Sequence, residues 1–137
     1  MQPGKLSHLQ INVQPENLGF YRDLFTLLGW RTIYDAPEML AMGDPNKVSL
    51  WFLPGAKPVP YDYDGAGVNH LGVGVEAQAD VDTAAQFLTQ KGIPHLFETP
   101  RHRPDFSESD THTYYQVMFE SPDGILWEIV YIGPKSA

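Results

Sequence analysis

The sequence predicts an α+β domain made of two copies of a βαβββ unit. Residues 6–13 and 68–75 alternate apolar and polar side chains, which is typical of half-buried strands. Each strand precedes a segment of helical apolar spacing that stops at a glycine, Gly29 in one case and Gly92 in the other. Three further strand-like segments follow each helix, so the same order of elements occurs twice along the chain.

The first unit is expected over residues 6–53. Its opening strand places Leu9 and Ile11 on the face that packs against the helix, and His8 and Gln10 on the opposite face. The apolar stripe of the helix consists of Leu18, Tyr21, Leu24, Phe25 and Leu28. The later strands are expected near residues 30–35, 38–43 and 47–53.

A linker rich in proline and glycine is predicted over residues 54–67, and the second unit over residues 68–132. Asp80 is the predicted N-cap of a helix over residues 81–91. The stripe of that helix consists of Val81, Ala84, Ala85 and Leu88. Strands are expected near residues 94–98, 113–120 and 124–132, and a long loop, absent from the first unit, over residues 99–112.

Composition excludes several classes of protein. The 137 residues suit a single domain with its own core and include no cysteine, so disulfide scaffolds, thiolate metal sites and cysteine nucleophiles are ruled out. The formal net charge of −8 disfavours a nucleic-acid partner. No leader-like or membrane-spanning segment is recognised, and we expect a cytoplasmic protein without a membrane partner.

Three residues form a candidate metal site. His8 and His70 occupy equivalent places in the two units, and Glu128 stands in an apolar strand, where an uncompensated carboxylate would be unfavourable. Two imidazoles and one carboxylate suit Fe(II), Mn(II), Zn(II) or Ni(II) and leave coordination positions open. Each histidine taken alone is better explained as a hydrogen-bonded core residue, and it is their equivalent placement together with Glu128 that favours a metal site.

The segments LSHLQINV, FYRDLFTLLGW, VNHLGVGV and SPDGILWEIVY together resemble the vicinal oxygen chelate superfamily. That group includes glyoxalase I, fosfomycin-resistance and bleomycin-resistance proteins and extradiol dioxygenases. The resemblance implies one domain over residues 1–137 in which the two units form an open, barrel-like cup. It also implies a divalent metal held by His8, His70 and Glu128, and a homodimer.

The chain departs from two patterns of these relatives. Where glyoxalase I-like members supply a fourth metal ligand, this sequence has Trp51 or Phe52, depending on how the units are aligned. Where extradiol dioxygenases carry a tyrosine before the closing turn it has Met118, and Tyr114 and Tyr115 are out of register with that place. Both activities are therefore disfavoured, although neither is eliminated.

The resemblance implies a metal-dependent enzyme that acts on a small substrate with vicinal oxygens, as a lyase, isomerase, transferase or dioxygenase. Glu128, Gln10 and His112 are the candidate catalytic groups. The candidate substrate-binding residues are Trp51, Arg101, Arg103 and Tyr115. The alternative is a metal-free protein that binds an antibiotic or another small molecule, as bleomycin-resistance proteins do.

Overall fold

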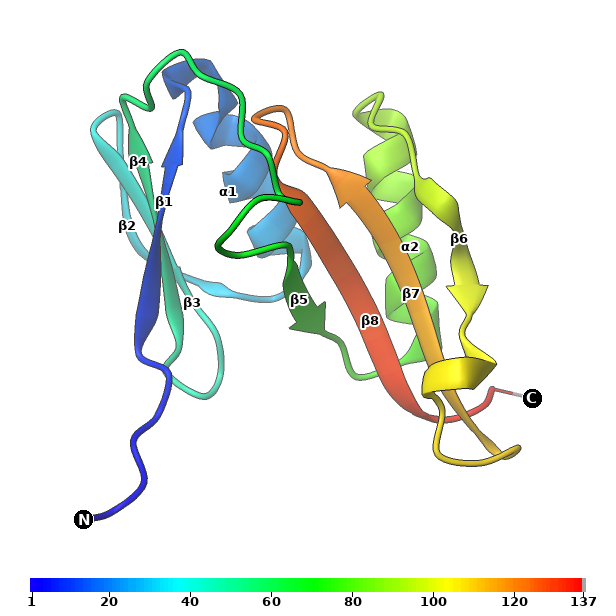
Figure 1. Cartoon of the computed structure of the whole chain (residues 1–137). Coiled ribbons are helices and arrows are strands. Elements are labelled where there is room, and N and C mark those ends of the chain that lie inside the picture. The colour runs from blue at the N-terminus through cyan, green and yellow to red at the C-terminus, as the bar shows by residue number, and fades with distance from the viewer. Residues whose placement is uncertain (137) are drawn as a thin grey trace. The chain divides into compact units, whose positions relative to one another are not determined.

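The computed structural model describes residues 1–136 and contains two compact units, one ending at Val59 and the other beginning at Pro60. Each unit has one main helix and one mixed four-stranded sheet (Figure 1). The predicted α+β class, with two βαβββ units, is therefore confirmed.

The first unit forms its sheet in the order β1-β4-β3-β2. Its elements are β1 (His8–Val13), η1 (Pro15–Asn17), α1 (Leu18–Leu27), β2 (Arg31–Ala36), β3 (Met39–Gly43) and β4 (Ser49–Pro54). Strands β1 and β4 are parallel, and the other neighbours are antiparallel. The long connection through α1 makes the parallel pairing possible, because parallel neighbours need a crossover.

The core of the first unit lies between α1 and the apolar face of its sheet. Four members of the predicted helical stripe are buried, and the fifth, Leu28, is half-buried. The Tyr21 ring stacks on the Phe52 ring of β4 with centroids 4.5 Å apart. Ile11 and Val13 of β1 are buried on the same side, while the alternate residues of β1 stay exposed.

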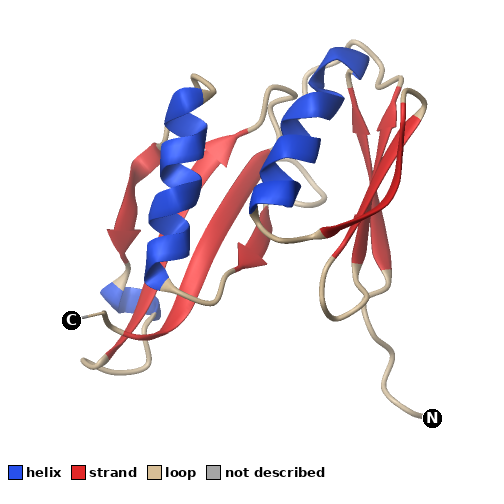
Figure 2. Ribbon diagram, turned by 180° about the vertical axis from the view of Figure 1, so that it is seen from behind, coloured by secondary structure: helices blue, strands red, loops and turns tan. Residues whose placement is uncertain are grey.

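The second unit repeats this arrangement with the order β5-β8-β7-β6. Its elements are β5 (Leu71–Gly74), α2 (Gln78–Gln90), β6 (Leu96–His102), η2 (Pro104–Phe106), β7 (His112–Glu120) and β8 (Leu126–Pro134). Strands β5 and β8 are parallel, and β6, β7 and β8 form an antiparallel ladder. Helix α2 lies along one face of this sheet (Figure 2).

The predicted stripe of α2 is buried at all four positions. Alternate residues of the strands, including Phe119, Trp127 and Ile129, are buried with it. Helix α2 therefore packs against one face of the second sheet, and the intervening residues of the strands point to the opposite face.

Both helices end as predicted, at a glycine with a left-handed backbone. The φ angles are 79° at Gly29 and 73° at Gly92, a conformation that glycine adopts without a steric penalty. The following amide closes each cap, from Trp30 to the Phe25 carbonyl and from Ile93 to the Leu88 carbonyl, at 2.9 Å in both cases. The helix ends are therefore structurally equivalent in the two units.

Three local predictions were wrong. Helix α2 begins at Gln78 after Ala77, so Asp80 lies in the first turn and is not the N-cap; there a carboxylate interacts favourably with the helix dipole. Strands β6 and β7 occupy both ends of the predicted 99–112 loop, and only residues 103–111 lie between them. The opening strands are shorter than the alternation predicted, because the ladder register begins only at His8 in one unit and at Leu71 in the other.

Neither α1 nor α2, nor any other helical segment in residues 1–136, is long and apolar enough to cross a membrane.

Candidate functional site

Glu128 lies on the face of the second sheet that points away from α2. Its neighbours in the ladder are Gly72 on β5 and Met118 on β7. The residue is only 4% exposed, although a carboxylate loses strong hydration when it is buried. A group in this position requires compensating donors or a cation.

Two side chains of β7 supply such donors. The Tyr114 hydroxyl donates to Glu128, at 2.9 Å from Oε1 and 3.0 Å from Oε2. The Gln116 side-chain amide donates to Oε2. Burial, together with the hydrogen bond and negative charge of Glu128, raises the pKa of Tyr114 to about 12, so this phenol remains a donor at neutral pH.

Tyr114 shows that the sequence interpretation of β7 was incomplete. It lies four residues before Met118, which is paired directly with Glu128 in the ladder. Residues two apart share a face of a strand, and the long tyrosine side chain spans the remaining distance. Tyr114 therefore contacts the Glu128 carboxylate, although it does not stand at the place where extradiol dioxygenases carry their tyrosine.

The ring orientation of His70 is fixed by Asn69. The Asn69 side-chain nitrogen donates to the Tyr63 carbonyl at 2.9 Å and to the Asp64 carboxylate at 3.3 Å. Its oxygen must then face Nδ1 of His70, 2.9 Å away, and accept from it. In a neutral His70 ring the proton is therefore on Nδ1, and Nε2 carries a free lone pair.

The lone pair of His70 lies near Glu128. The distance from Nε2 of His70 to Oε1 of Glu128 is 4.0 Å. Two electron-rich atoms so close repel one another unless a cation or a proton interacts with both. The His70 side chain is 39% exposed, so this pair is accessible from solvent.

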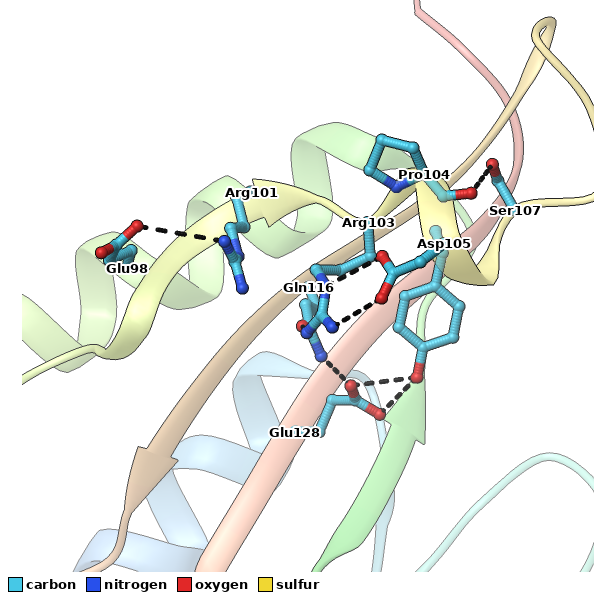
Figure 3. A network of polar contacts seen from close by, with 9 residues as sticks. Glu98, Arg101, Arg103, Pro104, Asp105, Ser107, Gln116 and Glu128 are labelled. Atoms are coloured by element: carbon cyan, nitrogen blue, oxygen red, sulfur yellow. Dashed lines mark hydrogen bonds and ion pairs between the residues drawn. The ribbon is translucent and has the colours of Figure 1, made fainter.

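Arg103 extends the network beyond the carboxylate. Its Nη1 donates to Oε1 of Gln116 at 3.0 Å, and its Nη2 forms an ion pair with Asp105 at 2.9 Å (Figure 3). The Phe106 ring lies under the guanidinium at 4.5 Å and meets the Tyr114 ring edge-on at 5.3 Å. The hydrogen bond with Asp105 raises the pKa of Arg103, and the same bond lowers the pKa of Asp105.

The first unit carries a related set of side chains on the exposed face of β1. His8 pairs its Nδ1 with the Ser7 hydroxyl at 3.0 Å, as His70 does with Asn69. Gln10, two residues further, is the ladder partner of Trp51, and the Trp51 indole donates to Ser49 at 2.9 Å.

The ladder register resolves the two alternative alignments of the units. Glu128 is paired with Gly72, two residues after His70, and Trp51 is paired with Gln10, two residues after His8. Trp51 is therefore the counterpart of Glu128, whereas Phe52 is fully buried on the helix side. An indole cannot serve as a metal ligand, so this position supplies none.

The side chains of three other predicted site residues contact groups other than Glu128. Arg101 is paired with Gln116 in the β6–β7 ladder, and its guanidinium lies 3.9 Å from the Glu98 carboxylate. His112 stands at the start of β7, where it contacts Ser109 and Thr111. Tyr115 points toward α2 and donates to Asp82 at 2.6 Å, so the structure does not bring it to Glu128.

Several residues that contact the candidate site were not predicted from the sequence. These are Asn69, Gly72, Phe106, Tyr114 and Gln116. Alternation along β7 could have identified Tyr114 and Gln116 as residues of one face. It could not have identified the residue to which each of them donates a hydrogen bond. Within residues 1–136, no cluster of three or more histidine and acidic side chains arranged for a metal is found.

Comparison with known proteins gives a consistent family. The model of the Glyoxalase/Bleomycin resistance protein/Dioxygenase superfamily matches residues 5–129. A Bacillus halodurans protein proposed to be a glyoxalase is 27% identical, with 93% of this chain and 96% of that chain covered and a TM-score of 0.76. No curated protein matches the chain.

Two more distant structures share the fold. A glyoxalase/dioxygenase from Nostoc punctiforme is 20% identical, with 96% and 92% coverage of the two chains and a TM-score of 0.71. A genomically encoded fosfomycin resistance protein from Listeria monocytogenes, solved with Mn(II) and sulfate, is 16% identical, with 95% and 91% coverage and a TM-score of 0.66.

Proposed function

Because the chain belongs to the Glyoxalase/Bleomycin resistance protein/Dioxygenase superfamily, we propose that it is a divalent-metal-dependent enzyme acting on a small substrate with vicinal oxygens. The metal ligands in this proposal are His8, His70 and Glu128. The observation that carries the proposal is the 4.0 Å distance between Nε2 of His70 and Oε1 of Glu128, in a ring whose Nδ1 already faces the Asn69 side chain.

The donor chemistry of these three side chains supports a divalent cation. Each histidine engages its Nδ1 with the side chain of the preceding residue, which leaves Nε2 for a metal. Glu128 is buried and oriented by two donors, as the carboxylates of metal sites are. The Mn(II) in the fosfomycin resistance protein from Listeria monocytogenes is compatible with this choice of ligands.

A bound metal would supply Lewis acidity toward the two substrate oxygens and stabilise the negative charge that develops on them. The protein side chains would position the substrate. Arg103 has five N–H donors, of which Asp105 and Gln116 occupy three, so two remain for an oxygen-rich group. Gln10 lies on the same strand face as His8 and would donate to the substrate, and Trp51 offers it an apolar surface.

Elemental analysis tests the proposal most directly. Protein prepared without a histidine tag would be offered Fe(II), Mn(II), Zn(II), Ni(II) and Co(II) in turn, anaerobically for Fe(II). We expect about one metal ion per chain, lost in His8→Ala, His70→Ala and Glu128→Gln. His95→Gln is the matched control, because His95 contacts the backbone of α2 and should not affect the metal.

Two results would reject the proposal. One is the absence of stoichiometric binding of all five metals by the parent protein. The other is full metal binding by Glu128→Gln. If metal binds as expected, substrate screens should begin with vicinal-oxygen compounds and use chelator-treated protein as the inactive control.

A second candidate function is metal-free binding of a small molecule, and one observation favours it. Tyr114 and Gln116 both donate to Glu128, so the buried carboxylate has partners without a metal. A metal-free binding protein should keep its ligand affinity when a chelator is added. The metal-dependent enzyme of the first proposal should lose its activity under the same treatment.

A further inference from the structure

A buried amide links the positive charge of Arg103 to the carboxylate of Glu128. We propose that Gln116 is a positioning residue that orients Glu128 and transmits to it the influence of Arg103. The inference rests on the proposed function, since it assigns Gln116 an effect on a metal held by Glu128. Gln116 is 1% exposed and lies between the two charged groups (Figure 3).

The charges on either side fix the orientation of the Gln116 amide. Its oxygen accepts from Nη1 of Arg103, and its nitrogen donates to Oε2 of Glu128. The flipped amide would place its NH2 group against a guanidinium and its oxygen against a carboxylate, and both contacts would be repulsive. Gln116 thus has one favourable orientation while both partners are charged.

Arg103 is itself held in place from the other side. Asp105 accepts from its Nε and Nη2, and the Phe106 ring lies against the guanidinium plane. A guanidinium fixed by these two neighbours presents Nη1 to Gln116 in a constant direction. The contacts therefore run from Arg103 through Gln116 to Oε2 of Glu128.

The two oxygens of Glu128 have different roles in this arrangement. Gln116 holds Oε2, Tyr114 donates to both oxygens, and Oε1 is the atom near Nε2 of His70. Without Gln116, the carboxylate keeps only the Tyr114 hydroxyl and can rotate about its last bond. Rotation would move Oε1 away from His70 and weaken a metal held by both.

The test compares metal affinity in Gln116→Met with that of the parent protein. Methionine keeps the unbranched shape but removes both hydrogen-bonding groups. Affinity would be measured by competition with a chromophoric chelator, and the ligand field by the visible spectrum of the Co(II)-loaded protein. We expect a loss of affinity of about tenfold or more at unchanged stoichiometry, with a shifted Co(II) spectrum.

Arg103→Met, alone and combined with Gln116→Met, tests whether Arg103 acts on metal binding through Gln116. If Arg103 acts through Gln116, its substitution weakens metal binding in the parent but has little further effect in Gln116→Met. Thr113→Val is the control for a merely structural effect, because Thr113 is a buried polar residue of β7 whose hydroxyl contacts His102. It should lower the melting temperature while leaving the metal affinity and the Co(II) spectrum unchanged.

The outcomes separate the inference from the proposed function. Parent-like affinity and spectrum in Gln116→Met, while Glu128→Gln loses the metal, would overturn the inference alone. Additive effects of the Arg103 and Gln116 substitutions would overturn the link between them. Absence of metal binding by the parent protein would overturn the proposed function, and the inference with it.

Discussion

A Cβ atom at Gly72 would lie 3.2 Å from Oε1 of Glu128. Glycine at this place in β5 lets the adjacent strand approach the carboxylate of β8 closely. The oxygen concerned is the one that lies near His70. The small size of residue 72 is therefore tied to the position of the candidate metal ligand.

We expect Gly72→Ala to weaken metal binding several-fold, because the added methyl group displaces Oε1 by a few tenths of an ångström. The free energy of unfolding should change by less than about 1 kcal/mol, since alanine also restricts the unfolded chain. Competition titration and urea denaturation measure the two quantities.

Gly74→Ala is the matched control for that substitution. Gly74 belongs to the same strand, and a Cβ there meets no atom within 4 Å. It should leave metal affinity unchanged and raise the free energy of unfolding by roughly 0.5 kcal/mol. Equal effects of the two substitutions on metal affinity would contradict the role of Gly72.

Removal of the Tyr114 hydroxyl should destabilise the apo protein. Tyr114→Phe leaves a carboxylate that is 4% exposed with one donor fewer, and we expect unfolding to become easier by about 1–3 kcal/mol. Denaturant titration in the presence of a chelator measures this value without a contribution from metal.

Tyr115→Phe provides the comparison for Tyr114→Phe. Its hydroxyl donates to Asp82, which is exposed and can recover hydration when the bond is lost. The expected loss is below about 1 kcal/mol. A larger loss in Tyr115→Phe than in Tyr114→Phe would show that the Glu128 network contributes little to stability.

Much of the fold could be predicted because periodicity reports burial directly. The stripe of α2 is buried at every predicted position, and both glycine stops have the expected positive φ. The start of α2 was missed because Asp80 matches an N-cap and a first-turn residue equally well. Such local alternatives differ by little free energy, and sequence alone does not separate them.

The candidate site was less predictable than the fold. Alternation placed His8 and Gln10 on the exposed face of β1, and the apolar surroundings of Glu128 marked it as unusual. The contacts of Tyr114 and Gln116 depend on how β7 is aligned with β8, and the register of β6 shifts between Leu96 and Arg101. The alternation within one strand shows which residues share a face, but the pairing register also depends on the partner strand and on the turn between the two.

Adjacent aromatic residues of β4 should respond differently to truncation. Phe52 is fully buried and stacks on Tyr21, so Phe52→Ala should lower the free energy of unfolding by about 3–5 kcal/mol. Trp51 is half-buried on the opposite face, and Trp51→Ala should cost less than about 2 kcal/mol. Thermal and urea unfolding distinguish the two; similar losses would mean that Trp51 belongs to the core.

Alkaline pH should destabilise the protein in part through Tyr115. Burial, and the hydrogen bond to Asp82, raise the pKa of Tyr115 to about 12 in the folded state, above the ordinary value of 10.0. The neutral phenol is thus favoured by folding, so its contribution is complete below pH 10 and is lost as pH rises toward 12. Phenylalanine cannot ionise, and Tyr115→Phe should show a shallower fall in unfolding free energy across this interval.

Tyr114 should contribute to the same alkaline destabilisation, because its pKa is also raised to about 12. Each single phenylalanine variant should remove part of the alkaline dependence, and the double variant more than either. Urea denaturation at a series of pH values from 8 to about 12 gives the slopes. A slope in Tyr115→Phe identical to that of the parent would show that this phenol ionises equally readily in the folded and unfolded chains.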